Sequence, residues 1–221
     1  MNIPDALMPS IWYWVAHVLM AGVAGWITLT APWRRLKDDA QSHVWLGTCV
    51  SLMVLWSIHS GLPRGLDFHL LGATAFTLMF GPQLAILGLS VVVSMLVVTG
   101  RLPIEAFSVN VLFLAVLPVT VSHGILRAVE GMLPRNFFIY IFVTAFFGAA
   151  LAMAASGSTA IGLVAAFGAP PLALLAEQFM PYCLLLAFAE ATLTGMVITL
   201  LVVYRPQWVG TFDDARYLSR R

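Results

Sequence analysis

Charged residues are scarce in this sequence. Its 221 residues include 11 Lys and Arg and 10 Asp and Glu, so about 10% carry a charge, whereas soluble domains carry roughly 25%. A chain this poor in charge cannot cover a soluble globular surface, so that class is excluded. The formal net charge of +1 also argues against a nucleic-acid partner, because binding to a phosphate backbone needs a strongly basic surface.

Cysteine is rare too, and the common catalytic motifs are missing. The two cysteines, Cys49 and Cys183, both fall inside apolar runs, which argues against a disulfide framework and favours packing roles. The sequence has no Gly-rich phosphate loop, no His-Glu-x-x-His and no Ser-His-Asp set that the topology would bring together. We therefore expect no enzymatic activity, neither that of a hydrolase nor that of a nucleotide-driven pump.

Apolar residues dominate what is present. They make up 61% of the chain and recur in runs of about 20 residues, the length that spans a bilayer as a helix. The pattern predicts an all-α polytopic membrane protein, a bundle of about seven transmembrane helices in one domain over residues 1–221. Gly and Pro signals separate the predicted spans, which are Ile11–Thr30, His43–Ser60, Leu66–Phe80, Gln83–Thr99, Ala106–Ile125, Asn136–Ala155 and Leu175–Tyr204. We expect a re-entrant or half-length helix in the Gly-, Ala- and Pro-rich Ser156–Leu174, which leaves the span count open by one.

The basic residues predict an orientation. Nine of the 11 Lys and Arg residues fall in segments that share one side of the membrane, and two, Arg64 and Arg101, fall on the other. Because cytoplasmic segments carry the excess of Lys and Arg, we expect the N-terminus outside and a cytoplasmic tail over residues 205–221. The expected location is the inner (plasma) membrane of the cell, with the lipid bilayer around a multi-pass chain.

The first ten residues lack the basic region that opens a secretory signal. We therefore expect residues 1–10 to remain in the mature protein. Because Asn2 is too bulky for the usual removal of the initiator Met, we expect Met1 to carry the free amino group. Apolar side chains such as Leu7 and Met8 would draw this segment into the bundle from the outer side.

The segment between the second and third predicted spans gathers polar residues at the edge of an apolar body. It carries His59, Asp67 and His69, and histidine is the commonest metal ligand in proteins. One interpretation is a metal or cation site. The other is a loop whose polar residues meet water and lipid headgroups, where histidine also occurs.

Glu190 lies near the middle of the last predicted span. An ionisable side chain at that depth is costly and is a functional candidate by default. No Lys or Arg lies at that depth, so the carboxyl is either protonated or hydrogen-bonded to Thr or Asn side chains, with Asn110 of the fifth span as the natural partner. The alternative is a structural hydrogen bond that holds two spans together.

The other histidines favour simpler roles. We expect His17 and His123 to be packing residues and His43 to lie at the membrane interface. His17 and His59 could lie at similar depth on different helices, which bis-histidine haem ligation requires. No further haem signature appears in the sequence.

The outer side offers nitrogen ligands that suit a transition metal. A free terminal amine binds Ni²⁺, Co²⁺ or Cu²⁺, and the next backbone amide nitrogen can join it once deprotonated, closing a five-membered chelate ring. One or two imidazoles complete a square-planar nitrogen set, the geometry that Ni²⁺ and Cu²⁺ prefer. His69 is the best-placed imidazole, and His59 is second.

Several motifs, in order along the chain, resemble one family. Met1–Pro9 resembles the Met-His-Ile-x-(Glu/Asp)-Gly-Phe-Leu-Pro opening of the substrate-binding membrane components of cobalt and nickel energy-coupling-factor transporters (CbiM/NikM type). Gly65–Gly72 and Phe80–Pro82 are similar to that family's Gly-Ser-Cys-Ser-His-Pro-Thr-Gly and Phe-Gly-Pro segments. Ala106–Pro118 is similar to its Gly-Ala-Asn-Thr-Phe-Ser-Met stretch, and Glu190–Gly195 to its Glu-Gly-Leu-Leu-Thr-Gly stretch.

The resemblance implies a seven-helix component (S-component) that holds one divalent transition-metal ion beneath its outer face, Co²⁺ or Ni²⁺, with Cu²⁺ or Zn²⁺ as alternatives. It also implies a transmembrane coupling subunit and ATP-hydrolysing subunits on other chains. In this family the amine of Met1, the amide and imidazole of residue 2, and the histidine that matches His69 bind the metal. Asn2 departs from the pattern because it lacks the imidazole, and His59 could replace that ligand. The supporting polar candidates are Asp67, Asn110 and Glu190.

Two other functions stay open from the sequence. A divergent relative could be a non-transport accessory membrane protein, or a module for an organic substrate such as a vitamin. A haem-bearing redox subunit is the other alternative. In the metal interpretation this chain captures the ion for import, and partner ATPases drive its release.

Overall fold

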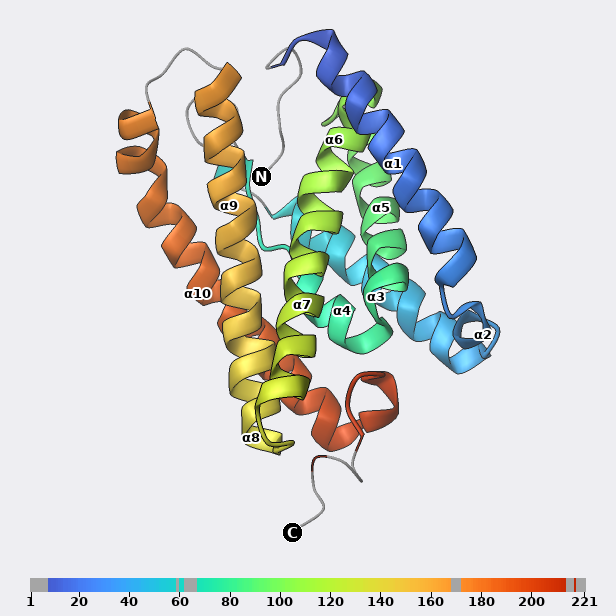
Figure 1. Cartoon of the computed structure of the whole chain (residues 1–221). Helices are drawn as coiled ribbons and strands as arrows, with labels where there is room; N and C mark the ends of the chain where they lie inside the picture. The colour runs from blue at the N-terminus through green and yellow to red at the C-terminus, as the bar shows by residue number, and fades with distance from the viewer. Residues whose placement is uncertain (1–7, 59, 62–66, 168–171, 214–216, 218–221) are drawn as a thin grey trace.

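A computed structural model describes residues 8–58, 60–61, 67–167, 172–213 and 217, and it shows a bundle of helices (Figure 1). Each of the seven predicted spans overlaps a helical segment. These segments are α1 (Ser10–Thr30), α3 (Asp39–Ser57), α4 (Ala73–Phe80), α5 (Pro82–Val98), the run from η1 to α7 (Ile104–Met132), the run from α8 to α9 (Phe137–Phe167) and α10 (Leu172–Tyr204). Of the described segments, four are long and apolar enough to cross a membrane: α1, the two composite runs and the Phe179–Tyr204 part of α10. The predicted helical architecture is confirmed, apart from one short hairpin.

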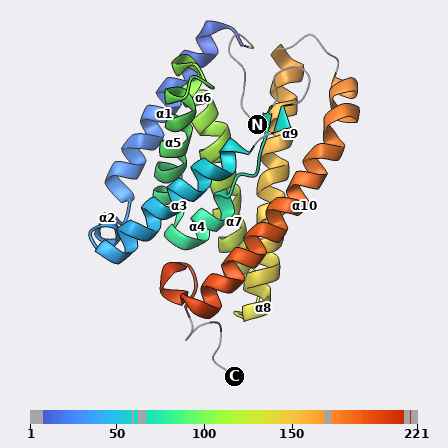
Figure 2. The ribbon, with the colours of Figure 1, turned by 180° about the vertical axis from the view of Figure 1, so that it is seen from behind.

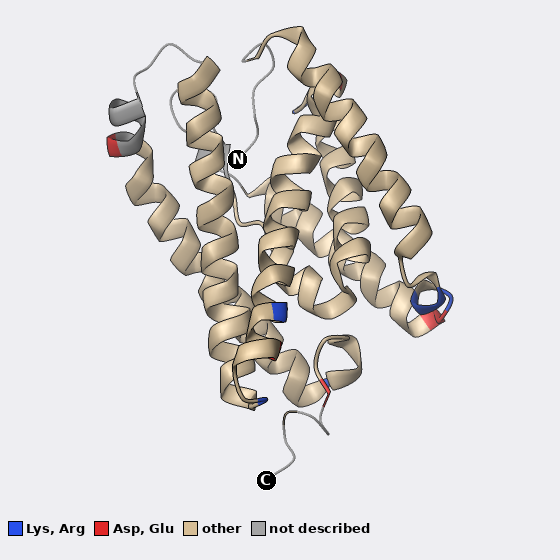
Figure 3. Ribbon diagram, viewed as in Figure 1, with Lys and Arg blue, Asp and Glu red and all other residues tan. Residues whose placement is uncertain are grey.

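The bundle has two ends, and most of the basic residues gather at one of them. α2 (Trp33–Leu36), α8 (Phe137–Ile139) and the segment that follows α10 lie toward this end, which we call the basic end (Figures 1 and 3). The opposite end carries the start of α1 and the end of α9. Because Lys and Arg are retained in the cytoplasm, we expect the basic end to face the cytoplasm.

α1 lies at the edge of the bundle and packs against α5 and α6. It begins directly after Pro9 and ends before Ala31, whose extended backbone leads into Pro32. Only 11% of its most apolar 18-residue stretch is buried inside the protein, so most of this helix faces away from the bundle. The next long helix, α3, begins where the carboxylate of Asp38 accepts the backbone N–H of Gln41 at 3.0 Å.

Two of the long runs contain π-helical turns. In the first, η1 (Ile104–Ala106) and α6 (Phe107–Val111) lead into the π-helical η2 (Leu112–Val116) and then α7 (Leu117–Met132). Pro118 has no backbone N–H to donate one turn back, and the wider turn directly before it accommodates that missing hydrogen bond. The second run passes from α8 through the π-helical η3 (Tyr140–Phe147) into α9 (Gly148–Phe167).

The third predicted span is much shorter than expected. Instead of one helix over Leu66–Phe80, the chain forms a hairpin of β1 (Ser60–Gly61) and β2 (Asp67–Phe68), and helix α4 starts only at Ala73. Gly72 adopts the left-handed φ of 66° just before the helix, a conformation that favours glycine. The apolar run therefore reflects burial rather than a membrane-spanning length.

The Gly-, Ala- and Pro-rich segment after Ala155 also differs from the expectation. Through Phe167 it is the continuation of α9 and not a separate half-length helix, and residues 168–171 lie outside the described part of the chain. Gly157 and Ala160 are buried where α9 packs against its neighbours. Small residues here allow close helix packing, as is common in membrane bundles, and do not break the helix.

α4 lies at the centre of the bundle. All but one of its residues are buried, and it packs against α5, α7, α9 and α10. On α5, Gly88 leaves the space that the Phe76 ring occupies, because a Cβ at that position would overlap the ring. Longer helices thus shield α4 from lipid. This explains how the helix can be much shorter than a membrane span.

The chain after α10 folds back onto the end of α4. Past η4 (Pro206–Trp208), the N–H of Gly210 donates to the carbonyl of Met79 at 2.9 Å, and the hydroxyl of Thr211 donates to the carbonyl of Leu78 at 2.8 Å. These carbonyls belong to the last turn of α4 and have no partner within the helix. The first part of the predicted tail is therefore folded against the bundle.

Candidate metal site

His69 is held in the interior, directly after the hairpin. Ser60 pairs with Phe68 and Gly61 with Asp67 in antiparallel register, and His69 follows as the chain turns toward α4. The exposed fraction of His69 is 3%. A histidine this deep in an apolar bundle is not an interfacial residue, so the interpretation of position 69 as part of a solvated loop is wrong.

The imidazole of His69 has a defined orientation. Its ring lies over the indole of Trp56 on α3, with the ring centroids 4.5 Å apart. Its Nδ1 lies 3.1 Å from the carbonyl oxygen of Leu70, and since a carbonyl oxygen only accepts, Nδ1 carries the proton. The acceptor lone pair is then on Nε2, the arrangement commonly found in metal-ligating histidines.

Glu190 holds the backbone that follows His69. One carboxylate oxygen accepts the N–H of Leu71 at 2.8 Å and the other accepts the N–H of Gly72 at 2.7 Å. The side chain is 1% exposed, and it reaches the start of α4 from the middle of α10. The carboxylate thus bonds the N-terminal end of α4, where unpaired N–H groups and the helix dipole favour an acceptor.

The same stretch of backbone is held from α3. The indole N–H of Trp56 donates to the carbonyl of Leu71 at 3.2 Å. A methyl group of Leu52 fills the place that a Cβ on Gly72 would need. Contacts from α3 and α10 therefore fix the two residues that precede α4, and through them the position of His69.

The structure describes some of the residues that the sequence predicts for the site and not others. Met1, Asn2 and His59 lie outside the described residues, so their metal ligation stays a prediction. Asp67 belongs to β2, one residue before Phe68 and two before His69. Within the described part of the chain, no three His, Cys, Asp or Glu side chains form a group that could hold a metal ion.

The predicted hydrogen bond between Glu190 and Asn110 does not form. Both oxygens of Glu190 accept backbone N–H groups, and the Nδ2 of Asn110 donates to the carbonyl of Ala106 at 3.0 Å within its own helical run. Both side chains are fully buried. The physical reason is that unpaired N–H groups at the start of α4 lie within reach of the carboxylate. Sequence periodicity gave no sign of these donors.

The remaining histidines are engaged elsewhere or lie outside the site. On α1, Nδ1 of His17 is 2.7 Å from the hydroxyl of Ser108 on α6, which confirms a packing role. His123 on α7 is partly buried, and its Nδ1 has no hydrogen-bond partner in the described structure. His43 is exposed near the start of α3 and bonds the carbonyl of Asp39.

Met8, two residues before α1, is buried. Met8 is 7% exposed and packs with Ala16 of α1 and Val109 of α6. Residues 1–7 lie outside the described part, so the entry of the terminus into the bundle stays a prediction. The burial of Met8 fits that prediction but does not test it.

Residues 2–208 match a protein family described as the cobalt uptake substrate-specific transmembrane region. The chain belongs to this family. The resemblance that the motifs indicated is thereby confirmed, and the chain is a multi-pass membrane component of a metal-uptake family rather than a member of a known enzyme class. No curated protein sequence matches the chain.

Two solved structures share the fold of this cobalt-uptake family member. A truncated transition metal transporter is 20% identical, with a TM-score of 0.76, and the alignment covers 92% of this chain and 99% of that one. A second transition metal transporter is 19% identical, with a TM-score of 0.71, covering 91% of this chain and 92% of that one. At this level of identity the likeness establishes the arrangement of the helices.

Proposed function

We propose that this chain captures one divalent transition-metal ion, Co²⁺ or Ni²⁺, as the substrate-binding component of an energy-coupling-factor importer. The observation that carries the proposal is the buried His69, oriented by Trp56 and by the backbone that Glu190 holds, in a chain of the cobalt-uptake family. A ligand that is already oriented binds a metal with less ordering cost than one on a mobile loop.

The proposed donor set combines His69 with the N-terminus. The amine of Met1 and the backbone nitrogen of residue 2 would supply two nitrogens, and His69 a third. Asn2 has no imidazole, so His59 on the segment before the hairpin would supply the fourth. Nitrogen-rich sets of this kind favour Ni²⁺ and Cu²⁺ with square-planar preference, and imidazole also suits Co²⁺ and Zn²⁺.

The proposed transport step needs other chains. The sequence carries no phosphate-binding loop, so this component would bind and release the ion while partner subunits hydrolyse ATP. A transmembrane coupling subunit would transmit that energy to the helices around His69. The ion is the substrate, and the direction would be import from the side opposite the basic end.

Metal stoichiometry tests the proposal. The purified protein is incubated with Co²⁺ or Ni²⁺, freed of excess ion and measured by elemental analysis. We expect about one ion per wild-type chain. His69→Ala should lose at least tenfold in affinity, since loss of even a residue that only supports a metal ligand typically costs 10–100-fold. His43→Ala, an exposed histidine on α3, is the matched control and should bind as the wild type does. Unchanged binding in His69→Ala would disprove the site.

A further inference from the structure

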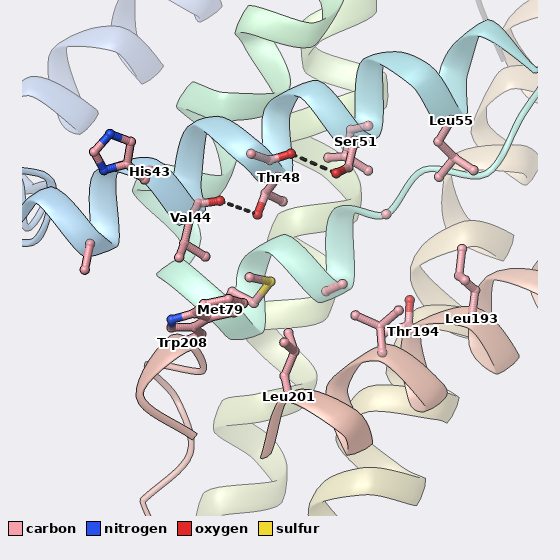
Figure 4. A pocket seen from close by; sticks show the side chains of 16 residues that line it. His43, Val44, Thr48, Ser51, Leu55, Met79, Leu193, Thr194, Leu201 and Trp208 are labelled. Carbon is pink, nitrogen blue, oxygen red and sulfur yellow. Dashed lines mark hydrogen bonds between the residues drawn. The ribbon is translucent and has the colours of Figure 1, made fainter. Parts of the chain in front are cut away.

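A large groove lies between α3 and α10, with α4 as its floor. Its volume is about 850 Å³. In the view from behind, α3 and α10 lie on the near side with α4 between them (Figure 2). Leu55 and Leu193 lie toward one end, and His43 and Trp208 toward the other, at the basic end (Figure 4).

The walls of the groove suit hydrocarbon. Most of its lining side chains are apolar, including Val44, Met79 and Leu201. The two α3 hydroxyls that line it donate within their own helix, Thr48 to the carbonyl of Val44 and Ser51 to that of Gly47, each at 2.8 Å (Figure 4). These two hydroxyls therefore need no polar ligand, and an acyl chain that lies along α3 leaves neither of them unpaired.

The basic end of the groove carries two arginines beside Trp208. Arg35 donates from Nη2 to the carbonyl of Trp208 at 3.5 Å and from Nε to the side chain of Gln41 at 3.1 Å. The guanidinium of Arg205 lies over the Trp208 ring, 5.9 Å from its centroid. Because Trp208 lines the groove at this end, both positive charges lie beside it.

Neither guanidinium is neutralised by a described carboxylate. Within the described residues the one ion pair is Arg127–Glu130, on α7. The nearby Asp38 uses its carboxylate to cap α3. Arg35 is half-buried, and this burial lowers the pKa of its guanidinium. The guanidinium also lies over the Phe80 ring, 4.9 Å from its centroid.

We propose that this groove binds an anionic phospholipid. The acyl chains would lie along α3, α4 and α10, and the phosphate would lie between Arg35 and Arg205. The groove and such a lipid are complementary. Basic sites between membrane helices on the cytoplasmic side bind anionic headgroups, and guanidinium groups match phosphate oxygens. This lipid site is separate from His69 and does not depend on metal binding.

Native mass spectrometry of the full chain tests the proposal. Delipidated protein in detergent is titrated with phosphatidylglycerol and, separately, with phosphatidylcholine of the same acyl chains. We expect one tightly retained phosphatidylglycerol, bound about tenfold more strongly than phosphatidylcholine. Equal retention of the two lipids would overturn the proposal, because the arginines would then play no part.

Variants of the two arginines and of the apolar wall test the headgroup site and the acyl-chain site separately. Arg205→Gln and Arg35→Gln should each reduce the preference for phosphatidylglycerol several-fold, while Arg127→Gln, an exposed arginine elsewhere, should not. Gly47→Leu should block the acyl site, and its matched control is Gly131→Leu. At both glycines an added Cβ meets no neighbouring atom within 4 Å, so the first carbon of the new side chain has room in both variants.

A partner helix is the competing occupant of the groove. If Gly47→Leu abolished co-purification of a co-expressed membrane subunit but left phosphatidylglycerol retention unchanged, the groove would be a protein interface and the lipid proposal would be wrong. If Gly47→Leu abolished phosphatidylglycerol retention while the control kept it, the lipid assignment would stand.

Discussion

Glu190 uses both carboxylate oxygens to hold the backbone that follows His69, and it does so from a helix 118 residues away from Gly72 in sequence. Contacts made by Trp56, Leu52 and Glu190 therefore help to position the imidazole of His69, in addition to the hairpin before it. We call Glu190 a positioning residue, because it acts on the proposed ligand through the backbone. This role can be tested separately from folding.

Glu190→Gln keeps the shape of the side chain but replaces one acceptor oxygen with an NH₂ donor. That donor meets the N–H of Leu71 or Gly72, so one hydrogen bond is lost and two donors face each other. We expect the free energy of unfolding to fall by about 1–3 kcal/mol and metal affinity to weaken. Glu177→Gln, the same change at an exposed position of α10, should alter neither quantity. Thermal unfolding and calorimetric metal titration measure both, and unchanged metal affinity in Glu190→Gln would argue against positioning.

Gly72 is required both for its backbone conformation and for the space beside it, and two variants can separate these effects. Its φ is 66°, and a Cβ there would overlap a methyl group of Leu52. Gly100 has a similar φ of 70° but open space around it. Gly100→Ala should cost about 1–2 kcal/mol of stability from the backbone alone. Gly72→Ala should cost about 1–3 kcal/mol more, because it also overpacks the site.

Thermal unfolding in detergent measures this difference. Adding Leu52→Ala should relieve the overlap and return part of the stability of Gly72→Ala, although it removes apolar packing of its own. Equal losses for Gly72→Ala and Gly100→Ala would show that the contact with Leu52 does not constrain the backbone.

At the scale of elements, α4 is a short helix held at both ends by α10 and its extension. Glu190 of α10 bonds the N-terminal side, and Gly210 and Thr211 bond the carbonyls of the last turn. The hydroxyl of Thr211 donates to Leu78 and accepts from the hydroxyl of Tyr140, 2.6 Å away. One chain segment thus connects the surroundings of His69 to the basic end.

Thr211→Val should loosen the C-terminal side of α4. The change leaves the carbonyl of Leu78 and the buried hydroxyl of Tyr140 with one bond fewer, so we expect a loss of about 1–3 kcal/mol in unfolding free energy. Thr192→Val is the control, since its exposed hydroxyl bonds only Phe188 in the same helix. Hydrogen exchange of α4 amides should rise in Thr211→Val and stay unchanged in Thr192→Val. Equal exchange in the two variants would contradict the role of this connection.

The sequence pattern predicted most elements. It failed where a short buried helix has the same apolar composition as a membrane span. Runs of apolar residues located α1, α5 and α10 to within a few residues. The same signal could not distinguish the eight-residue α4 from a longer span, because a helix shielded by other helices is apolar on every side. Density of Gly and Ala in α9 was interpreted as a break, although between membrane helices it allows close packing.

At the scale of the whole molecule, the candidate site and the basic end are different regions joined by α4. His69 could be recognised from sequence as a candidate ligand, and Glu190 as a costly buried group. Their connection could not be predicted, since local periodicity does not say which backbone N–H groups a carboxylate on another helix will meet. The groove beside Arg35 and Arg205 could not be predicted from the sequence either, because it forms only when α3, α4 and α10 come together.

X-ray absorption of the Ni²⁺-loaded protein tests the central claim most directly, because it reports the ligands of the bound ion. We predict a nitrogen-rich first shell with imidazole scattering in the wild type and in His43→Ala. In His69→Ala the imidazole contribution should decrease together with the amount of bound metal, and Asn2→His should increase it. A spectrum of His69→Ala with the wild-type imidazole signal at full occupancy would contradict the account.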